Sequence, residues 1–150
     1  MVRFLKNTQK DIVNVWAFVS SNVHPDFYIT ENNQRIYITS FSILKKLLKQ
    51  SHTIIVSENQ CSIDGIIMIW KGTGEKIKRN YIKFSAKDVS ILDKLITFLS
   101  WNFTKDIYIK IKKHSHSCQK FQDKNFRFVG GRGKEMLLCR KKSGNYFNKS

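Results

Sequence analysis

The chain has 150 residues, a length that suits one domain rather than two independent cores. Its 27 lysine and arginine residues against 11 acidic residues give a net charge of +16, while an apolar fraction of 41% argues against a disordered basic tail. The longest apolar run, Gly65–Trp70, is too short to cross a membrane, and the odd count of three cysteines argues against a disulfide scaffold.

These properties predict one cytoplasmic domain over residues 1–140, followed by a polar tail over 141–150. In chain order, the first predicted element is a short strand at Val2–Leu5. Apolar residues spaced three and four apart then mark a helix that ends near Asn22. Residues 27–38 have no clear period and suggest a loop, and 40–50 form a short amphipathic helix.

The middle of the chain changes to a strand pattern. Residues 53–57, 63–70 and 78–84 predict an antiparallel meander, because turn residues separate three apolar runs. A helix over 86–102 follows, and then 106–113 alternates apolar and polar residues as a half-buried strand does. The last elements are a short helix and two strands: 115–124, 126–129 and 136–139. The order is therefore β-α-α-β-β-β-α-β-α-β-β, an α/β class with a mixed central sheet.

The positive charge has two readings. A net charge of +16 suggests an acidic partner, such as nucleic acid or a phosphorylated cofactor. However, 21 of the basic residues are lysine and only 6 are arginine, and the chain also has 18 isoleucines and 11 asparagines, as A/T-rich coding favours. Arginine is the residue of choice for bidentate phosphate and base contacts, so we expect weak, non-specific and salt-dependent polyanion binding.

The order of elements resembles the Gcn5-related N-acetyltransferase (GNAT) superfamily over nearly the whole chain. The segment Phe121-Gln-Asp-Lys-Asn-Phe126, followed by two strands, is similar to the family's closing pattern of a short helix, Tyr-Glu-Lys-Leu-Gly-Phe and a strand. The resemblance implies acetyl-CoA as the donor and a primary amine, from a small molecule or a protein, as the acceptor. Small proteins of this type also occur in bacteriophages, including as virion components, and the A/T-rich composition is compatible with that origin.

In this family, a glycine-rich loop before the central helix holds the CoA pyrophosphate at the helix N-terminus. The matching junction, Phe84–Asp88, contains no glycine, and Asp88 places a carboxylate in the first turn, where it competes with a bound phosphate. Ser85 and Asp88 are predicted to cap the helix, and Lys87 to contact a phosphate. The residues expected at the cofactor are Tyr81, Lys83, Phe84, Ser85, Ala86 and Lys87.

The resemblance also implies a general base, often a glutamate on the central strands. Strand 78–84 has no carboxylate. Asp64 on the preceding strand is therefore the candidate base, and Glu58, His24 and Asp26 are alternatives.

The family's general acid is often a tyrosine on the last helix. Its position here holds Phe121, which has no proton to give, so Cys118 or His116 becomes the candidate acid. The series His114, His116 and Cys118 also has a metal-like spacing. Because it spans a strand-to-helix junction and no second ligand pair exists, we expect no metal site.

Aromatic and basic residues share the polar faces of two predicted strands. Tyr81 and Lys83 lie on one face of their strand, and Tyr108, Lys110 and Lys112 lie on one face of the next. If the faces coincide, the sheet carries an aromatic and cationic surface that suits a phosphorylated ligand or a single-stranded nucleic acid. The alternative is that these lysines extend past the helix edges to water.

Three functions remain open from the sequence. The first is an acyl-CoA-dependent N-acyltransferase, and the second is a non-catalytic domain that keeps the same fold for binding or assembly. The third is a basic nucleic-acid-binding module. The sequence predicts neither the acceptor nor the oligomeric state.

Overall fold

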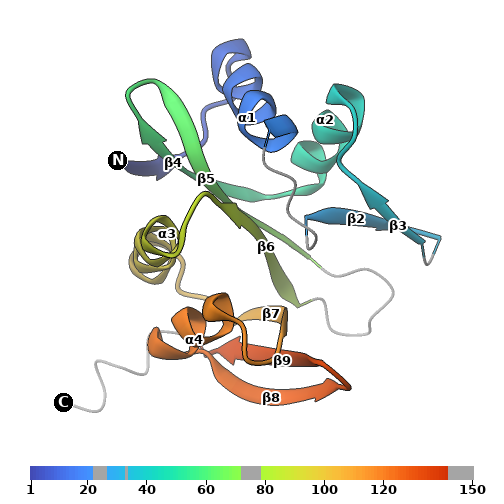
Figure 1. The fold of residues 1–150 in the computed structure, drawn as a ribbon, viewed down its shortest axis with the longest axis vertical. Coiled ribbons are helices and arrows are strands. Elements are labelled where there is room, and N and C mark those ends of the chain that lie inside the picture. Colours follow the sequence, from blue (N-terminus) through green and yellow to red (C-terminus); the bar gives the residue numbers. More distant parts are fainter. Residues whose placement is uncertain (22–26, 33, 72–78, 142–150) are drawn as a thin grey trace.

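The computed structural model describes residues 1–21, 27–32, 34–71 and 79–141, so the predicted tail beyond Lys141 and the alternative bases His24 and Asp26 lie outside the described residues. At its centre lies a seven-stranded sheet in the order β1-β4-β5-β6-β7-β9-β8 (Figure 1). The strands are β1 (Val2–Phe4), β4 (Thr53–Asn59), β5 (Ser62–Lys71), β6 (Asn80–Ala86), β7 (Ile107–Lys112), β8 (Arg127–Arg132) and β9 (Glu135–Arg140). Neighbouring strands run antiparallel, except β6 and β7, which are parallel. The predicted α/β class with a mixed sheet is confirmed.

Helices cover both faces of this sheet (Figure 1). Helices α1 (Gln9–Ser21) and α2 (Phe41–Gln50) pack on one face, and α3 (Val89–Asn102) and α4 (His116–Asp123) pack on the other. Ser40 and Ser115 are the N-caps of α2 and α4, because each hydroxyl accepts a hydrogen bond from an amide in the first turn. None of the described helices is long and apolar enough to span a membrane.

The alternation of side chains along the strands divides the core into two layers. In β7, Ile107, Ile109 and Ile111 are buried beneath α3 and α4, as the predicted alternation requires. In β5, Ile67 and Ile69 face the same layer, whereas Ile66 and Met68, which alternate with them, face α1 and α2. Central strand β5 is therefore apolar on both faces.

The segment expected to be a loop contains a hairpin instead. Strands β2 (Tyr28–Glu31) and β3 (Gln34–Tyr37) pair antiparallel in a separate two-stranded sheet. Aromatic and β-branched residues on both strands favour this pairing, and Asn32, with φ 49°, adopts the left-handed geometry that a tight turn needs. The loop prediction was wrong because a short aromatic hairpin shows no long-range period.

The junction between β6 and α3 also differs from its prediction. Ser85 and Ala86 belong to β6, where they pair with Ile66 and Gly65 of β5, and α3 begins only at Val89. Asp88, rather than Ser85, is the N-cap of α3. The pairing of β6 with β5 thus extends the strand through a residue whose capping tendency suggested a helix start.

Candidate functional site

The candidate site begins where the parallel strands β6 and β7 separate. They pair only at Asn80 with Ile107 and at Tyr81 with Tyr108, although β6 continues to Ala86. Beyond these two pairs the strands no longer pair with each other, and we call the place where they part the opening and the two strands its arms. The backbone groups that face it are therefore not used in a ladder between β6 and β7. An extended ligand can form hydrogen bonds with such an edge, as a paired strand would.

The N-terminus of α3 lies at the end of the β6 arm. The amide of Ile91 donates to Asp88 Oδ1 over 2.9 Å, and the Asp88 carbonyl accepts the first helical bond, from Leu92. The amides of Val89 and Ser90 have no acceptor within the helix, as is general for a first turn. These amides and the positive end of the helix dipole suit an anion, but the Asp88 carboxylate already occupies part of that field.

The residues predicted to contact the cofactor divide between the two faces of the sheet. Phe84 is buried on the α4 side, where its ring centroid lies 5.4 Å from that of Phe121. Tyr81 and Lys83 are half-buried on the opposite face, and Ser85 follows them there as a buried residue. Ala86 is half-buried at the end of the strand, and Lys87 is exposed in front of α3.

Asp64, the candidate base, lies on β5 beside this junction. Its carbonyl accepts a hydrogen bond of 2.9 Å from the amide of Lys87, which fixes its position relative to the start of α3. Its side-chain Oδ1 is buried and has no hydrogen-bond partner among the described residues. A buried oxygen without a donor is costly, so a ligand that donates a hydrogen bond to this atom would relieve that cost. The alternative base Glu58 instead binds Arg3 at 2.5 Å.

The candidate acids lie at the start of α4. Cys118 is buried, with Sγ 3.8 Å from Met136 Sδ, and burial raises the pKa of its thiol. The thiol therefore keeps its proton at neutral pH. His116 is exposed at the first residue of the helix. In the part of the chain that the structure describes, no three metal-ligating side chains gather around one point.

The fully buried ring of Phe121 fills the space behind these residues. It contacts Phe126 at 5.1 Å between ring centroids as well as Phe84. A phenylalanine is thus part of the core at the position where the resemblance expects a tyrosine.

Sequence reasoning missed a polar cluster at the start of β6. His52 Nε2 lies 3.2 Å from Asn80 Oδ1, and the Asn80 amide donates to the carbonyl of Asp106 over 3.3 Å. The His52 ring also stacks on Phe103 at 6.1 Å. Asn80 thus links the residue before β4 to the residue before β7, at the closed end of the opening. The available signal was an asparagine at an inward-facing position of an apolar strand.

Tyr81 and Tyr108 meet at the closed end on the α1 and α2 side. Their ring centroids are 5.9 Å apart, so the polar faces of the two strands coincide, which is the condition stated above for an aromatic and cationic surface. Burial and a hydrogen bond with Cys139 raise the pKa of Tyr108. This phenol therefore stays protonated at neutral pH.

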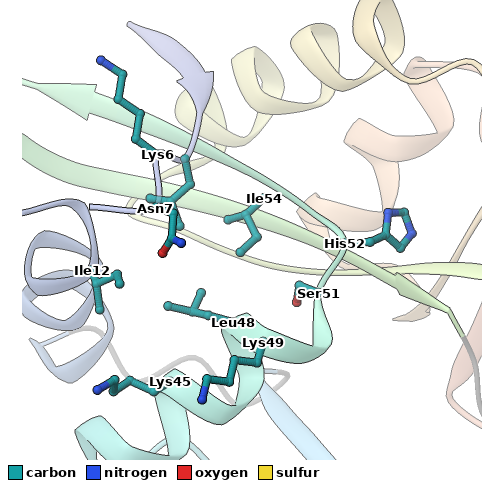
Figure 2. Close-up of a pocket in the computed structure, with 10 residues that line it drawn as sticks. Lys6, Asn7, Ile12, Lys45, Leu48, Lys49, Ser51, His52 and Ile54 are labelled. Carbon is teal, nitrogen blue, oxygen red and sulfur yellow. The ribbon is translucent and has the colours of Figure 1, made fainter. Parts of the chain in front are cut away.

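A groove of about 430 Å³ lies apart from the opening, between α1, α2 and the start of β4 (Figure 2). Its apolar walls include Ile12, Leu48 and Ile54, and Lys45 and Lys49 extend along its α2 side. The His52 ring points away from the groove (Figure 2). An apolar floor beside two ammonium groups suits an organic anion, and this groove adds to the positive field of the molecule.

No family model and no curated protein matches the chain. Solved structures do match it. An N-acetyltransferase from Staphylococcus aureus has a TM-score of 0.66 at 13% identity, with 94% of this chain and 96% of that chain covered. The acetyltransferase of the GNAT family from Streptococcus pneumoniae has a TM-score of 0.64 at 12% identity, covering 93% of this chain and 98% of its own. The yncA protein of Salmonella typhimurium, solved with its cofactor acetyl-CoA, has a TM-score of 0.62 at 10% identity, covering 94% and 92%.

In each comparison the likeness extends over nearly the full length of both chains. The identities of 10–13% show that this likeness is one of fold rather than of sequence. The chain therefore has the fold of the Gcn5-related N-acetyltransferases.

Proposed function

We propose that the protein is an acyl-CoA-dependent N-acyltransferase that uses acetyl-CoA and a primary amine. The observation that carries this proposal is the opening between β6 and β7 beside the N-terminus of α3. The fold supports it, because solved proteins of this fold include acetyltransferases and one of them, yncA, was solved with acetyl-CoA.

The residues around the opening fit this cofactor. The amides of Val89 and Ser90 and the ammonium group of Lys87 would hold the pyrophosphate, since all three offer positive charge at one helix end. The separated edges of β6 and β7 would bind the extended arm of the cofactor. The Asp88 carboxylate weakens this binding without blocking it, because it uses only the amide of Ile91 among the first-turn donors.

When bound, acetyl-CoA supplies a thioester, and transfer forms a carbon–nitrogen bond, breaks the carbon–sulfur bond and moves one proton from the amine to the sulfur. In this proposal, Asp64 Oδ1 accepts the proton that the amine loses. The thiol of Cys118, or the protonated ring of His116 if it is the acid, donates the proton that the departing sulfur takes up. Exchange with solvent then restores both groups.

Release of free CoA thiol in the presence of a panel of amines tests the proposal. We expect release that depends on an amine, and we expect Asp64→Asn to lower kcat about 100-fold or more, as the loss of a general base does. Cys118→Ala and His116→Ala identify the acid. Cys61→Ala is the matched control, because this cysteine is exposed in the turn between β4 and β5.

Two results would count against the proposal at different levels. Unchanged turnover in the Asp64, Cys118 and His116 variants would remove the roles given to these residues but leave the reaction. No thiol release with any amine would contradict the reaction itself and favour a non-catalytic protein of the same fold.

A further inference from the structure

Four of the five tyrosines of the chain belong to one continuous surface on the α1 and α2 side of the sheet. We name it the tyrosine–cation surface, because each of these rings contacts a basic side chain or another ring that does. Its members are Tyr28, Tyr37, Tyr81, Tyr108, Arg35, Arg79, Lys83 and Lys110.

The first half of this surface, formed by Tyr81, Tyr108, Arg79 and Lys110, lies where β6 and β7 separate. The guanidinium carbon of Arg79 lies 4.8 Å from the ring centroid of Tyr108, and Lys110 Nζ lies 5.6 Å from that of Tyr81. Both distances are within the range of cation–π attraction. Arg79 and Lys110 are exposed and the two rings are half-buried, so the cations are held in place at a surface that solvent reaches.

The second half comes from the hairpin that the sequence did not predict. Lys83 Nζ on the β6 arm lies 3.2 Å from the ring centroid of Tyr28, and the guanidinium of Arg35 lies 4.8 Å from the same centroid. The ring of Tyr37 packs against Tyr28 at 5.7 Å. The hairpin β2–β3 therefore extends the surface and fixes a lysine of the β6 arm.

The two lysines occupy matching places on the two arms. Lys83 lies two residues beyond Tyr81 on β6, and Lys110 lies two residues beyond Tyr108 on β7, so both project from the same face. A ligand that approaches the opening from this face meets one ammonium group from each arm. A phosphate monoester, which carries close to two negative charges at neutral pH, matches such a pair.

We infer that the tyrosine–cation surface binds the acceptor, and that the acceptor is a small amine carrying a phosphate group. This inference rests on the proposed function, because it assumes that the protein transfers an acyl group to an amine. It places that amine on the face of the sheet opposite α3 and α4. It assigns Tyr81 and Lys83 to the acceptor rather than to the cofactor.

A small phosphorylated molecule fits this surface better than a single-stranded nucleic acid. Proteins that bind single strands stack the bases on open aromatic faces. Here the rings of Tyr28, Tyr81 and Tyr108 each have a cation over one face, so stacked bases would have to displace it. A phosphate uses those cations where they already lie.

Calorimetric titration without acetyl-CoA tests the inference. The matched probes are tyramine and its O-phosphate ester, called tyramine phosphate below. We expect tyramine phosphate to bind at least tenfold more tightly than tyramine, and we expect the double variant Lys83→Gln, Lys110→Gln to lose this preference. Lys94→Gln, which removes one charge from the exposed side of α3, should keep it. Equal binding of the two probes, or a preference that survives the double variant, would overturn the inference.

Three further arms separate this inference from its rivals. Displacement of tyramine phosphate by excess CoA would place the phosphate in the cofactor site and overturn the inference. A single-stranded oligonucleotide that binds through Lys83 and Lys110 while tyramine phosphate does not would overturn it as well.

Acetyl transfer to tyramine and tyramine phosphate at equal kcat/KM would leave the proposed reaction standing without this acceptor class. Tight binding of tyramine phosphate without transfer would support the surface and contradict the reaction.

Discussion

Arg3 joins three elements through two carboxylates. Its guanidinium forms two hydrogen bonds with Asp11 of α1, at 2.8 and 2.9 Å, and also binds Glu58 of β4. The bond with Arg3 holds the pKa of Asp11 below its ordinary value, and the Lys6 amide, which also donates to Asp11, lowers it further. The edge strand β1 is thus attached to both its neighbouring strand and the first helix.

This ion pair makes stability depend on acidity. The folded state binds a proton at Asp11 less readily than the unfolded state, so the contribution is complete above the ordinary Asp pKa of about 4. It is lost as the pH falls through the lower pKa of the folded state. We expect Asp11→Asn to lower the unfolding free energy by about 1–3 kcal/mol at pH 7, as measured by urea denaturation. The unfolding free energy of this variant should also fall less steeply as the pH is lowered.

Asp93→Asn is the control for this prediction. Asp93 pairs with Lys124 at 3.7 Å with both side chains about one-third exposed, so its loss should cost less than about 1 kcal/mol. Equal effects of the two substitutions would show that the Arg3 pair adds nothing beyond an ordinary surface pair.

Asp88 sets the affinity of the α3 N-terminus for an anion. Asp88→Asn keeps a good N-cap and removes the negative charge. Because a charge at this position is worth about 0.3–1 kcal/mol, we expect acetyl-CoA to bind about 2- to 5-fold more tightly in calorimetry. The same exchange at Asp93, beyond the first turn of α3, should change the affinity little. Weaker binding in Asp88→Asn would mean that the carboxylate supports the cofactor site.

At the scale of elements, α3 approaches the sheet closely because β5 has a glycine beneath it. A Cβ added at Gly65 would lie 2.7 Å from Ile91 Cγ2 and 2.8 Å from Leu95 Cδ1. We expect Gly65→Ala to lower the unfolding free energy by about 1–3 kcal/mol, because the helix must shift or its side chains must leave their preferred rotamers.

The matched substitution is Gly130→Ala in β8, where an added Cβ meets nothing within 4 Å. It should change the unfolding free energy by less than about 0.5 kcal/mol. Chemical denaturation of both variants checks the pair, and a Gly65 variant as stable as the Gly130 variant would contradict the close approach of α3.

The elements that sequence reasoning predicted well are those whose two faces differ. Strand β7 alternates because one face is buried and the other is wet, and α2 has a leucine face and a lysine face. The hairpin β2–β3 and the start of α3 were missed because partners far along the chain decide them. Tyr28 pairs with Tyr37, and Ser85 pairs with Ile66, which no local pattern reveals.

The candidate site follows the same division. Asp64, Lys87 and Asp88 could be predicted to lie near one another from the order of the elements, and the amide of Lys87 does bind the carbonyl of Asp64. The contact of His52 with Asn80 could not, because it joins the residue before β4 to β6, and these two strands are not adjacent in the sheet. Contacts across a sheet depend on register, which the sequence specifies only through the whole fold.

For the whole molecule, the order of the elements carried the prediction of the fold, and the individual motifs carried little. The structural neighbours share 10–13% of their residues with this chain, yet they match its fold with TM-scores of 0.62–0.66 over 93–94% of its length. Fold alone does not settle function. The missing glycines at Phe84–Asp88 and the phenylalanine at 121 are the features that separate this chain from the family's pattern.

The net charge of +16 complicates every binding measurement on this protein. Exposed lysines, such as those on α2 around the groove of Figure 2, attract anions without a specific site. Such attraction weakens steeply with salt and does not distinguish one phosphate compound from another. A specific cofactor site must therefore be separated from the general positive field.

Calorimetric titration with acetyl-CoA at moderate salt, with ADP as the control, tests whether the opening between β6 and β7 binds this cofactor. ADP carries the pyrophosphate and the base but lacks the arm that would enter the opening between β6 and β7. We expect saturable one-to-one binding of acetyl-CoA at least tenfold tighter than that of ADP. Equal binding of the two ligands, or no binding of either, would contradict this expectation and mean that the fold is kept without its cofactor.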